Sequence, residues 1–398
     1  MTVTIIQGDS RDVLPTLEAG RYQAIVTSPP YWGLRDYGVP GQLGLEPTPE
    51  LYVASIVEVM RAARRVLRDD GVLWLNIGDS YATCASTTRA PGGKNREVFR
   101  PALAAGAFPM SQPNRMRHAF ESAGIEPDEL VGIPWMTAFA LRADGWRLRA
   151  DIIWSKPNPT PESTRTRPTK AHEYVFLFTK SREYFYDIDA IREPHVDPRS
   201  SKNGRTKLNG QAALRPRGNL DSVERWYNPA GRNKRSVWTI ATEPYPGDFY
   251  AKMPEELAKV CILAGTSERG RCRACGAPWR RCVESTRLVD GAPAEGLGAW
   301  RSTDKGRPER KGPRIGNYRR TTSRTTVGWE ASCACQAGEP VPCEVLDPFG
   351  GVGTTGRVAE RLGRHSTLVE LNPATIALAR TETAQLGLFA GVERDDDP

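Results

Sequence analysis

A ten-residue stretch near the C-terminus, Asp347-Pro-Phe-Gly-Gly-Val-Gly-Thr-Thr-Gly356, has the composition of a loop that holds a nucleotide. The apolar pair before it predicts a strand that ends at Asp347, and the glycines permit a tight turn with no side chain to obstruct a ligand. A second apolar run ends at Glu370, 17 residues beyond Gly353, which is about the spacing at which an acid on the next strand binds ribose hydroxyls. The sequence therefore predicts a cofactor that contains a nucleoside.

The same loop also satisfies the dinucleotide pattern through Gly351, Gly353 and Gly356, but that pattern alone is weak. Two features argue against an NAD-dependent oxidoreductase. The loop lies at the end of the chain and does not open it, and the residues after it are too few to form a substrate domain.

A second motif, Ser28-Pro-Pro-Tyr31, follows an apolar run that predicts a strand from Ala24 to Thr27. The Ser28 hydroxyl and the Pro29 carbonyl are acceptors that could take the hydrogens of an exocyclic base amine. Such an amine is a poor nucleophile because its lone pair is delocalised into the ring, and two fixed acceptors favour a pyramidal nitrogen. The prolines stiffen the turn, and Tyr31 could stack on the base. Such a motif would suit direct transfer to an amine without a covalent intermediate, whereas taken alone it is also typical of an ordinary proline turn at a strand end.

Together the two motifs resemble motifs I and IV of the amino-methylating DNA methyltransferases, which use S-adenosylmethionine. In the permuted beta class of this family the catalytic half precedes the cofactor loop and the target-recognition region lies between them, which is the order found here. Stretches such as Tyr31–Gly38, Arg167–Tyr174 and Arg232–Trp238 look like a bacterial and phage subgroup. The resemblance covers nearly all of residues 1–385.

The resemblance implies roles for individual residues. Ser28, Pro29, Pro30 and Tyr31 would form the catalytic site. Asp9 would contact the cofactor adenine, Glu370 the ribose, and the loop at Asp347 the methionine end. The other residues that the resemblance assigns to the cofactor, of which the first three would cover it, are Phe249, Pro254, Glu255, Pro348, Phe349, Gly350, Gly351, Gly353, Thr354, Thr355 and Asn372.

These features predict an α/β protein with the Rossmann-like fold of S-adenosylmethionine-dependent methyltransferases and a mixed seven-stranded sheet. Since ligands of such sheets bind outside the carboxyl ends of strands, Asp9, Ser28, Asp347 and Glu370 should share one rim. Runs at 146–154 and 174–180 predict an antiparallel hairpin at the sheet edge. We expect a catalytic half at 1–180 with a mobile loop at about 85–126, a target-recognition region at 181–245, a cofactor-binding half at 246–267 and 344–385, a cysteine-bearing basic insertion at 268–343, and a tail at 386–398.

Positive charge is concentrated in two segments of a chain whose net charge is +8. Residues 199–235 carry ten basic and two acidic residues, and residues 269–324 carry fifteen basic and five acidic ones. Because phosphate neutralisation supplies much of the affinity for nucleic acid, both segments indicate DNA, with Arg232, Lys234 and Arg235 as candidate contacts. Trp226, Tyr227 and Trp238 are interleaved with the first segment and could contact bases. The alternative is that both segments are solvated loops.

Four of the eight cysteines have the spacing of a structural zinc site. Cys272 and Cys275 form a Cys-x-x-Cys-Gly knuckle, and Cys333 and Cys335 could complete a tetrahedral set of thiolates. A 57-residue interval and a single spacer in the second pair leave alternatives, in which Cys282 or Cys343 substitutes, the thiols are free and buried, or two form a redox pair.

The predicted function is site-specific methylation of double-stranded DNA at the N4 amine of a flipped cytosine. Serine at position 28 resembles the cytosine-N4 enzymes, whereas aspartate or asparagine is commoner in adenine-N6 enzymes, so N6-adenine methylation is the first alternative. A zinc-bearing DNA-binding protein with an inactive methyltransferase core is a more remote one. RNA and protein are further candidate substrates.

No apolar run approaches 18 residues and no secretion signal opens the chain, so we expect no membrane segment. The predicted location is the cytoplasm of a bacterial or phage-infected cell, in association with the nucleoid. A cognate restriction endonuclease, as part of a restriction-modification system, is a candidate partner, and the protein is expected to be a monomer or homodimer.

Overall fold

A computed structural model of the chain describes residues 2–82, 120, 123–194, 231–243, 252–289, 320–336 and 338–389. The chain forms two compact units, which are described separately. The first comprises Met1–Asp187, Arg235–Trp279 and Ala331–Pro398, and the second Ile188–Lys234 and Arg280–Glu330. Most of the loop predicted at 85–126 and of the target-recognition region lies outside the described residues.

The first unit is built on one mixed sheet of eight strands. In spatial order they are β1 (Val3–Gln7), β10 (His365–Glu370), β9 (Glu344–Asp347), β2 (Tyr22–Thr27), β3 (Leu67–Ile77), β5 (His172–Thr179), β4 (Arg147–Ser155) and β6 (Val237–Thr239). The first five are parallel, and β5 runs antiparallel to both β3 and β4. The predicted fold class and the antiparallel pairing of the two hairpin strands are confirmed, but the sheet has eight strands where seven were predicted, and β6 lies at the edge where the hairpin was expected. The additional strand is the three-residue β6, which is too short to leave a pattern in the sequence.

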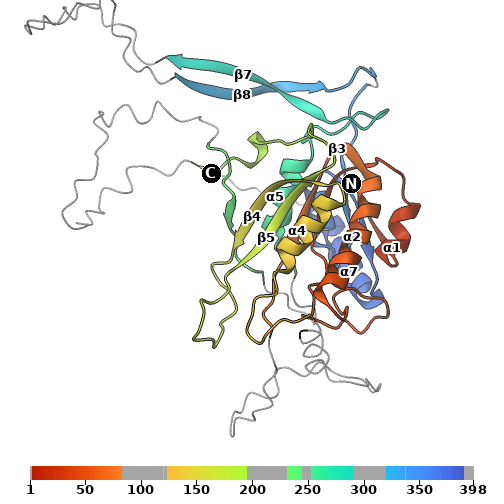
Figure 1. The fold of residues 1–398 in the computed structure, drawn as a ribbon. Coiled ribbons are helices and arrows are strands. Elements are labelled where there is room, and N and C mark those ends of the chain that lie inside the picture. The colour runs from red at the N-terminus through yellow and green to blue at the C-terminus, as the bar shows by residue number, and fades with distance from the viewer. Residues whose placement is uncertain are drawn as a thin grey trace, which may run out of the picture. The chain divides into compact units, whose positions relative to one another are not determined.

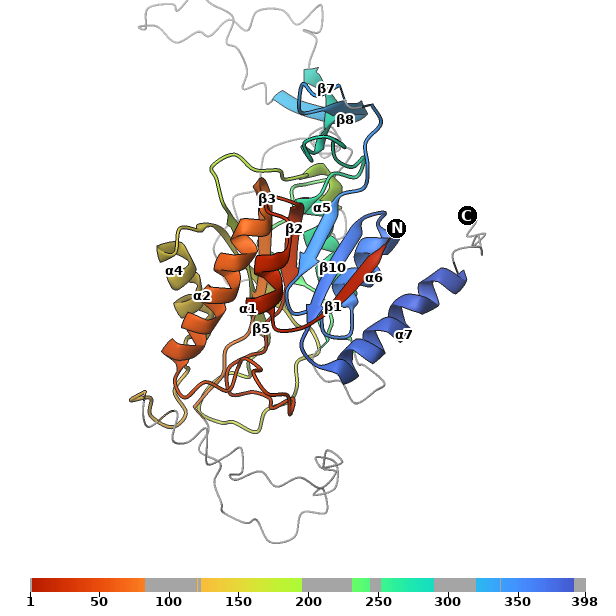
Figure 2. The same ribbon diagram turned by 90° about the vertical axis from the view of Figure 1, so that its right-hand side faces the viewer.

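Helices cover both faces of this sheet (Figure 2). On one side lie α2 and α4, and on the other α5 and α6. The helical elements of this unit are α1 (Ser10–Val13), η1 (Leu14–Thr16), α2 (Pro49–Val66), α4 (Ile133–Ala143), α5 (Glu255–Gly265), α6 (Thr354–Arg361) and α7 (Pro373–Phe389). Among the residues that the structure describes, no helix combines the length and apolar character needed to cross a membrane.

Helix α2 shows how the sequence fixes one of these layers. Thr48 caps it by accepting a hydrogen bond from the Leu51 amide, and Pro49 occupies the first turn, where its missing N–H is not needed. Its buried residues recur at helical spacing, for example at Tyr52, Ile56 and Met60. The buried stripe anchors the helix against the sheet, so the loop after β2 is held between two rigid elements.

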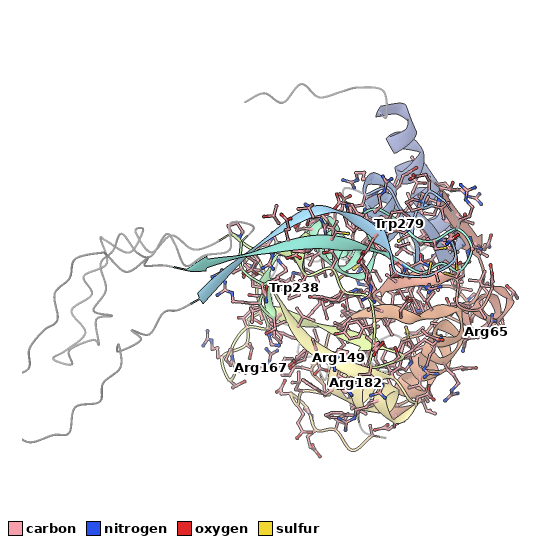
Figure 3. The ribbon with its side chains drawn as sticks, turned by 90° about the horizontal axis from the view of Figure 1, so that it is seen from above. Arg65, Arg149, Arg167, Arg182, Trp238 and Trp279 are labelled. Carbon is pink, nitrogen blue, oxygen red and sulfur yellow. The ribbon has the colours of Figure 1, made fainter. Side chains whose placement is uncertain are left out.

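Trp238 is a core residue, which corrects the prediction that it contacts bases. Its side chain in β6 is 3% exposed, and its ring centroid lies 6.0 Å from that of Trp74 on β3. The indole nitrogen donates to the Arg235 carbonyl at 2.7 Å. Figure 3 labels the Trp238 side chain. A segment in which an aromatic residue stands among basic ones resembles one that contacts bases. Only the pairing of β6 with β4 shows that this aromatic residue is buried. Trp226 and Tyr227 lie outside the described residues.

The second unit contains a two-stranded sheet of β7 (Trp279–Val289) and β8 (Arg320–Ala331), drawn as a long ribbon in Figure 1. The Arg281 guanidinium lies 4.4 Å from the ring centroid of Trp329, which joins the two strands across one face. The 3-10 helix η2 (Asp189–Ile191) belongs to the other part of this unit.

Candidate active site

The two predicted motifs meet at one rim of the sheet. The carboxyl ends of the parallel strands lie along the same edge, and a cavity of about 560 Å³ opens there. The predicted residues that line it are Asp9, Ser28, Pro29, Pro30, Tyr31, Asp347, Pro348, Phe349, Gly350, Gly351, Thr354, Thr355, Glu370 and Asn372. The expectation that the four strand ends share a rim is therefore confirmed.

Asp347 ties the two motifs together. Its carboxylate accepts hydrogen bonds from Thr27 Oγ1 at 2.6 Å and Thr355 Oγ1 at 2.7 Å. The Phe349 amide donates to it at 3.0 Å. The side chain is 3% exposed, and burial raises its pKa to about 6 although these donors act to lower it. Since Thr27 directly precedes Ser28, the same carboxylate fixes the start of the Ser-Pro-Pro-Tyr turn.

The glycine loop has backbone angles that favour glycine. Gly351 and Gly353 have φ values of 52° and 83°, in the left-handed region. Glu370 holds the loop from the neighbouring strand, because its carboxylate accepts from the Gly351 amide at 2.9 Å and the Asn372 amide at 2.8 Å. Burial raises the pKa of Glu370, and these amides act to lower it. A Cβ at Gly356 would lie 2.8 Å from Val3 Cγ1, so this glycine lets α6 approach the sheet closely.

Asp9 follows β1 at the same rim. It caps α1 by accepting from the Arg11 amide at 2.8 Å, and its carboxylate pairs with Arg11 Nη2 at 2.5 Å. Arg11 also donates to the Gly41 carbonyl at 2.9 Å. The carboxylate is thus held in one orientation beside the cavity.

The turn from Ser28 to Tyr31 is held by neighbours on helix α2, on strand β5 and directly after strand β3. Tyr52 donates to the Pro30 carbonyl at 2.8 Å, which holds the second proline. The Tyr31 hydroxyl lies 2.5 Å from Glu173 Oε2 and 3.4 Å from Ser28 Oγ. A Cβ at Gly78 would lie 2.5 Å from Tyr31 Cε2, so the tyrosine ring packs directly on that backbone.

The cavity also contains polar residues that the sequence did not single out as catalytic. Glu173 accepts hydrogen bonds from Lys156 Nζ and from Asn76 Nδ2, the latter at 3.1 Å. Asp79 and Lys170 line the cavity as well. To identify Glu173 as a residue of the cavity, one must know the direction of β5 in the sheet. Because β5 is antiparallel to β3, its first residues lie at the rim where β3 ends.

Some residues expected at the cofactor do not line the cavity. Gly353 is the N-terminal cap of α6. Pro254 precedes α5, and Glu255 pairs with Arg357 at 3.0 Å and Arg361 at 2.5 Å. Glu255 therefore links α5 to α6 in this structure. Phe249 lies outside the described residues.

The three candidate DNA-binding residues differ in their surroundings. Arg232 Nε and Lys234 Nζ lie 3.1 Å and 3.9 Å from the carboxylate of Glu193. Arg235 is exposed. One acid thus partly neutralises two of the three charges.

The predicted cysteine set is brought together in the first unit. The sulfur atoms of Cys272, Cys275, Cys333 and Cys335 all lie within 4.8 Å of one another. The first pair is on a tight turn in which the Gly276 amide donates to the Cys272 carbonyl at 2.9 Å. Four clustered thiols match the donor set of a structural zinc ion. The suggested substitutes lie elsewhere, since Cys282 is on β7 and the buried Cys343 donates to the Ser267 carbonyl at 3.6 Å.

Comparison with known proteins agrees with this geometry. The family model described as DNA methylase, for N6 and N4 methyltransferases, matches residues 22–272. The Type II methyltransferase M.SmaI of Serratia marcescens is 41% identical over 270 residues, which are 67% of this chain and 76% of the relative. M.SfiI of Streptomyces fimbriatus is 31% identical over 406 residues, covering 92% of this chain and 87% of the relative.

The solved PvuII DNA methyltransferase, described as cytosine-N4-specific, aligns with 100% of this chain and 89% of its own at a TM-score of 0.50 and 14% identity. This similarity concerns the fold, which is that of the S-adenosylmethionine-dependent DNA methyltransferases. The chain belongs to the N6/N4 DNA methylase family and is a DNA methyltransferase.

The buried Asp347 predicts a specific pH dependence of stability. Its folded pKa of about 6 lies above the ordinary value of 3.8, so the unfolded chain releases the proton first as pH rises. The free energy of unfolding therefore falls by up to about 3 kcal/mol as the pH rises from about 4 to about 6. Asp347→Asn cannot ionise, and its stability relative to wild type should increase from pH 4.5 to pH 7.5 in urea unfolding. An equal difference at both pH values would contradict this, and Asp36→Asn on an exposed loop is the control.

Proposed function

We propose that the protein transfers a methyl group from S-adenosylmethionine to the N4 amine of a cytosine flipped out of double-stranded DNA. The observation that carries this proposal is the single cavity shared by the Ser28 turn and the Asp347 loop. Serine at position 28 favours cytosine. The alternative is N6 methylation of adenine, whose exocyclic amine presents the same chemical problem.

The rim residues suit this cofactor. A volume of about 560 Å³ is within the range of small-molecule sites, and the glycine loop presents backbone without side chains. We assign Asp9 to the adenine, Glu370 and Asn372 to the ribose side, and the loop from Asp347 to Thr355 to the methionine end. When bound there, S-adenosylmethionine supplies a methyl group on a positively charged sulfur. Pro254 and Glu255 do not line the cavity, so we assign them no contact with the cofactor.

Ser28 and Pro29 make the amine reactive. Their oxygens can accept its two hydrogens, which favours a pyramidal nitrogen whose lone pair is no longer shared with the ring. The turn needs little reorganisation because Asp347 holds Thr27 and Tyr52 holds Pro30. The amine then releases one proton to solvent.

The target base must leave the duplex to reach Ser28. Flipping costs a few kcal/mol, which contacts in the pocket can offset. Tyr31 lines the cavity next to Ser28 and is proposed to pack against the extruded base.

The cellular setting follows from DNA as substrate. We propose a cytoplasmic, nucleoid-associated enzyme that acts as monomer or homodimer. Its similarity to enzymes named Type II methyltransferases suggests a restriction endonuclease partner. The remote alternative, a DNA-binding protein with an inactive core, would bind DNA but not the cofactor.

The catalytic assignment is tested by Ser28→Ala. Calorimetry should show that the wild type and the Ser28→Ala variant both bind S-adenosylmethionine at micromolar affinity and that neither binds NAD. Single-turnover transfer of tritiated methyl should go to DNA and not to RNA or protein, and Ser28→Ala should slow it by roughly ten- to a thousand-fold. Asp347→Ala should chiefly weaken the cofactor. Near wild-type transfer by Ser28→Ala would refute the assignment.

The DNA-binding assignment is tested through salt dependence. Replacing Arg232, Lys234 and Arg235 by alanine should weaken binding and reduce the slope of log affinity against log salt by up to about three units. Arg61→Ala, which removes an exposed arginine of α2 that pairs with Asp144, is the control and should leave the slope unchanged. An unchanged slope in the triple variant would identify these residues as a solvated surface.

We also propose a structural zinc ion at Cys272, Cys275, Cys333 and Cys335. Metal analysis of protein purified without chelator should give about one zinc per chain. The Cys272→Ser and Cys275→Ser double variant should lose both the metal and stability, whereas Cys282→Ser should keep both. Active protein without stoichiometric metal would mean that the four thiols are free.

A further inference from the structure

Glu173 is a carboxylate in the cavity that the proposed chemistry does not yet use. Its side chain is 14% exposed, and three donors surround it. Lys156 Nζ donates to Oε1, while Asn76 Nδ2 at 3.1 Å and the Tyr31 hydroxyl at 2.5 Å share Oε2. An ionised carboxylate can accept hydrogen bonds but cannot donate them. Its neighbours must therefore all be donors.

This requirement determines the direction of the next hydrogen bond. Tyr31 has one hydroxyl hydrogen, and the short contact assigns it to Glu173. The phenol oxygen can then only accept from Ser28, whose Oγ lies 3.4 Å away. Ser28 consequently directs its own hydrogen toward Tyr31. The lone pairs of Ser28 Oγ are left for a donor in the cavity, such as an amine.

Asn76 and Lys156 support the same direction. The Asn76 amide group donates to Glu173 Oε2 and to the Tyr174 carbonyl, both at 3.1 Å, so its own carbonyl oxygen is the atom 3.3 Å from the Tyr31 hydroxyl. Tyr31 is thus a donor toward either neighbour. Lys156, whose ammonium also lies 4.5 Å from the ring centroid of Trp154, keeps the other carboxylate oxygen in place.

We propose that Glu173 is a positioning residue that fixes the hydrogen-bond direction from Ser28 through Tyr31, so that Ser28 accepts a hydrogen from the target amine. This inference rests on the proposed role of Ser28. A glutamine at position 173 would remove this fixed direction. Lys156 would hold its carbonyl oxygen, and its NH₂ group would donate to Tyr31, which could then donate to Ser28 or to the Asn76 carbonyl oxygen. Whenever Tyr31 donates to Ser28, Ser28 directs its hydrogen into the cavity, where the amine also presents hydrogens.

The test is Glu173→Gln in single-turnover methyl transfer to DNA. The rate should fall roughly ten- to a hundred-fold, while the dissociation constants of S-adenosylmethionine and DNA stay within about two-fold of wild type. A merely structural role would change those constants together with the rate. Glu256→Gln is the control, because Glu256 also pairs with a lysine, Lys259, but does not line the cavity. It should leave the transfer rate within about two-fold.

A double variant separates this relay from a general loss of structure. Tyr31→Phe removes the hydroxyl through which Glu173 acts, so adding Glu173→Gln to it should slow transfer by less than about two-fold further. The proposal would be overturned if the fold-decreases in transfer rate of the two single variants multiplied in the double variant. A wild-type rate in Glu173→Gln would overturn it as well. If Ser28→Ala lowers the transfer rate and Glu173→Gln does not, the proposal for Glu173 is wrong and the proposed role of Ser28 stands. If Ser28→Ala leaves the transfer rate unchanged, the proposed role of Ser28 is itself wrong.

Discussion

The parallel pairing of β2 with β9 is the constraint on which the site depends. Ala24 and Ile25 pair with Val345 and Leu346, so the two strands end side by side. The Thr27–Asp347 hydrogen bond of 2.6 Å then fixes the turn that follows one strand to the loop that follows the other. A slip of one residue would turn every side chain of β2 to the opposite face. The register therefore determines whether amine site and cofactor site share a cavity.

The ends of the chain complete the cofactor side of the sheet. The N-terminal β1 pairs with β10, which lies next to β9, and the Gly8 amide donates to the Glu370 carbonyl at 3.0 Å. Asp9 consequently reaches the rim beside Glu370 although 360 residues separate them in sequence. On the other side of β2, the antiparallel β5 begins at the rim and supplies Glu173 to the cavity, next to Tyr31. Residues from three separate parts of the sequence thus form one cavity.

The sequence predicted the parts of this site that follow parallel strands, because an apolar run that ends in Ser28, Asp347 or Glu370 indicates where the side chain lies. It did not indicate Glu173, because the position of a residue at the start of a strand depends on that strand's direction in the sheet. Trp238 was misassigned since composition does not distinguish a buried aromatic from an exposed one. Local spacing indicated the pairs Cys272 with Cys275 and Cys333 with Cys335, and folding closes the long interval between the two pairs.

We propose that the cavity presents Ser28 as an acceptor to the N4 amine of cytosine beside a bound methyl donor. Nucleoside mass spectrometry of DNA from a methylation-free host that expresses this chain tests it most directly. We expect N4-methylcytosine in this DNA, and none when the host expresses Ser28→Ala. N6-methyladenine in its place would contradict the assignment of the base, and unmodified DNA from cells containing the folded, cofactor-binding protein would contradict the proposed activity.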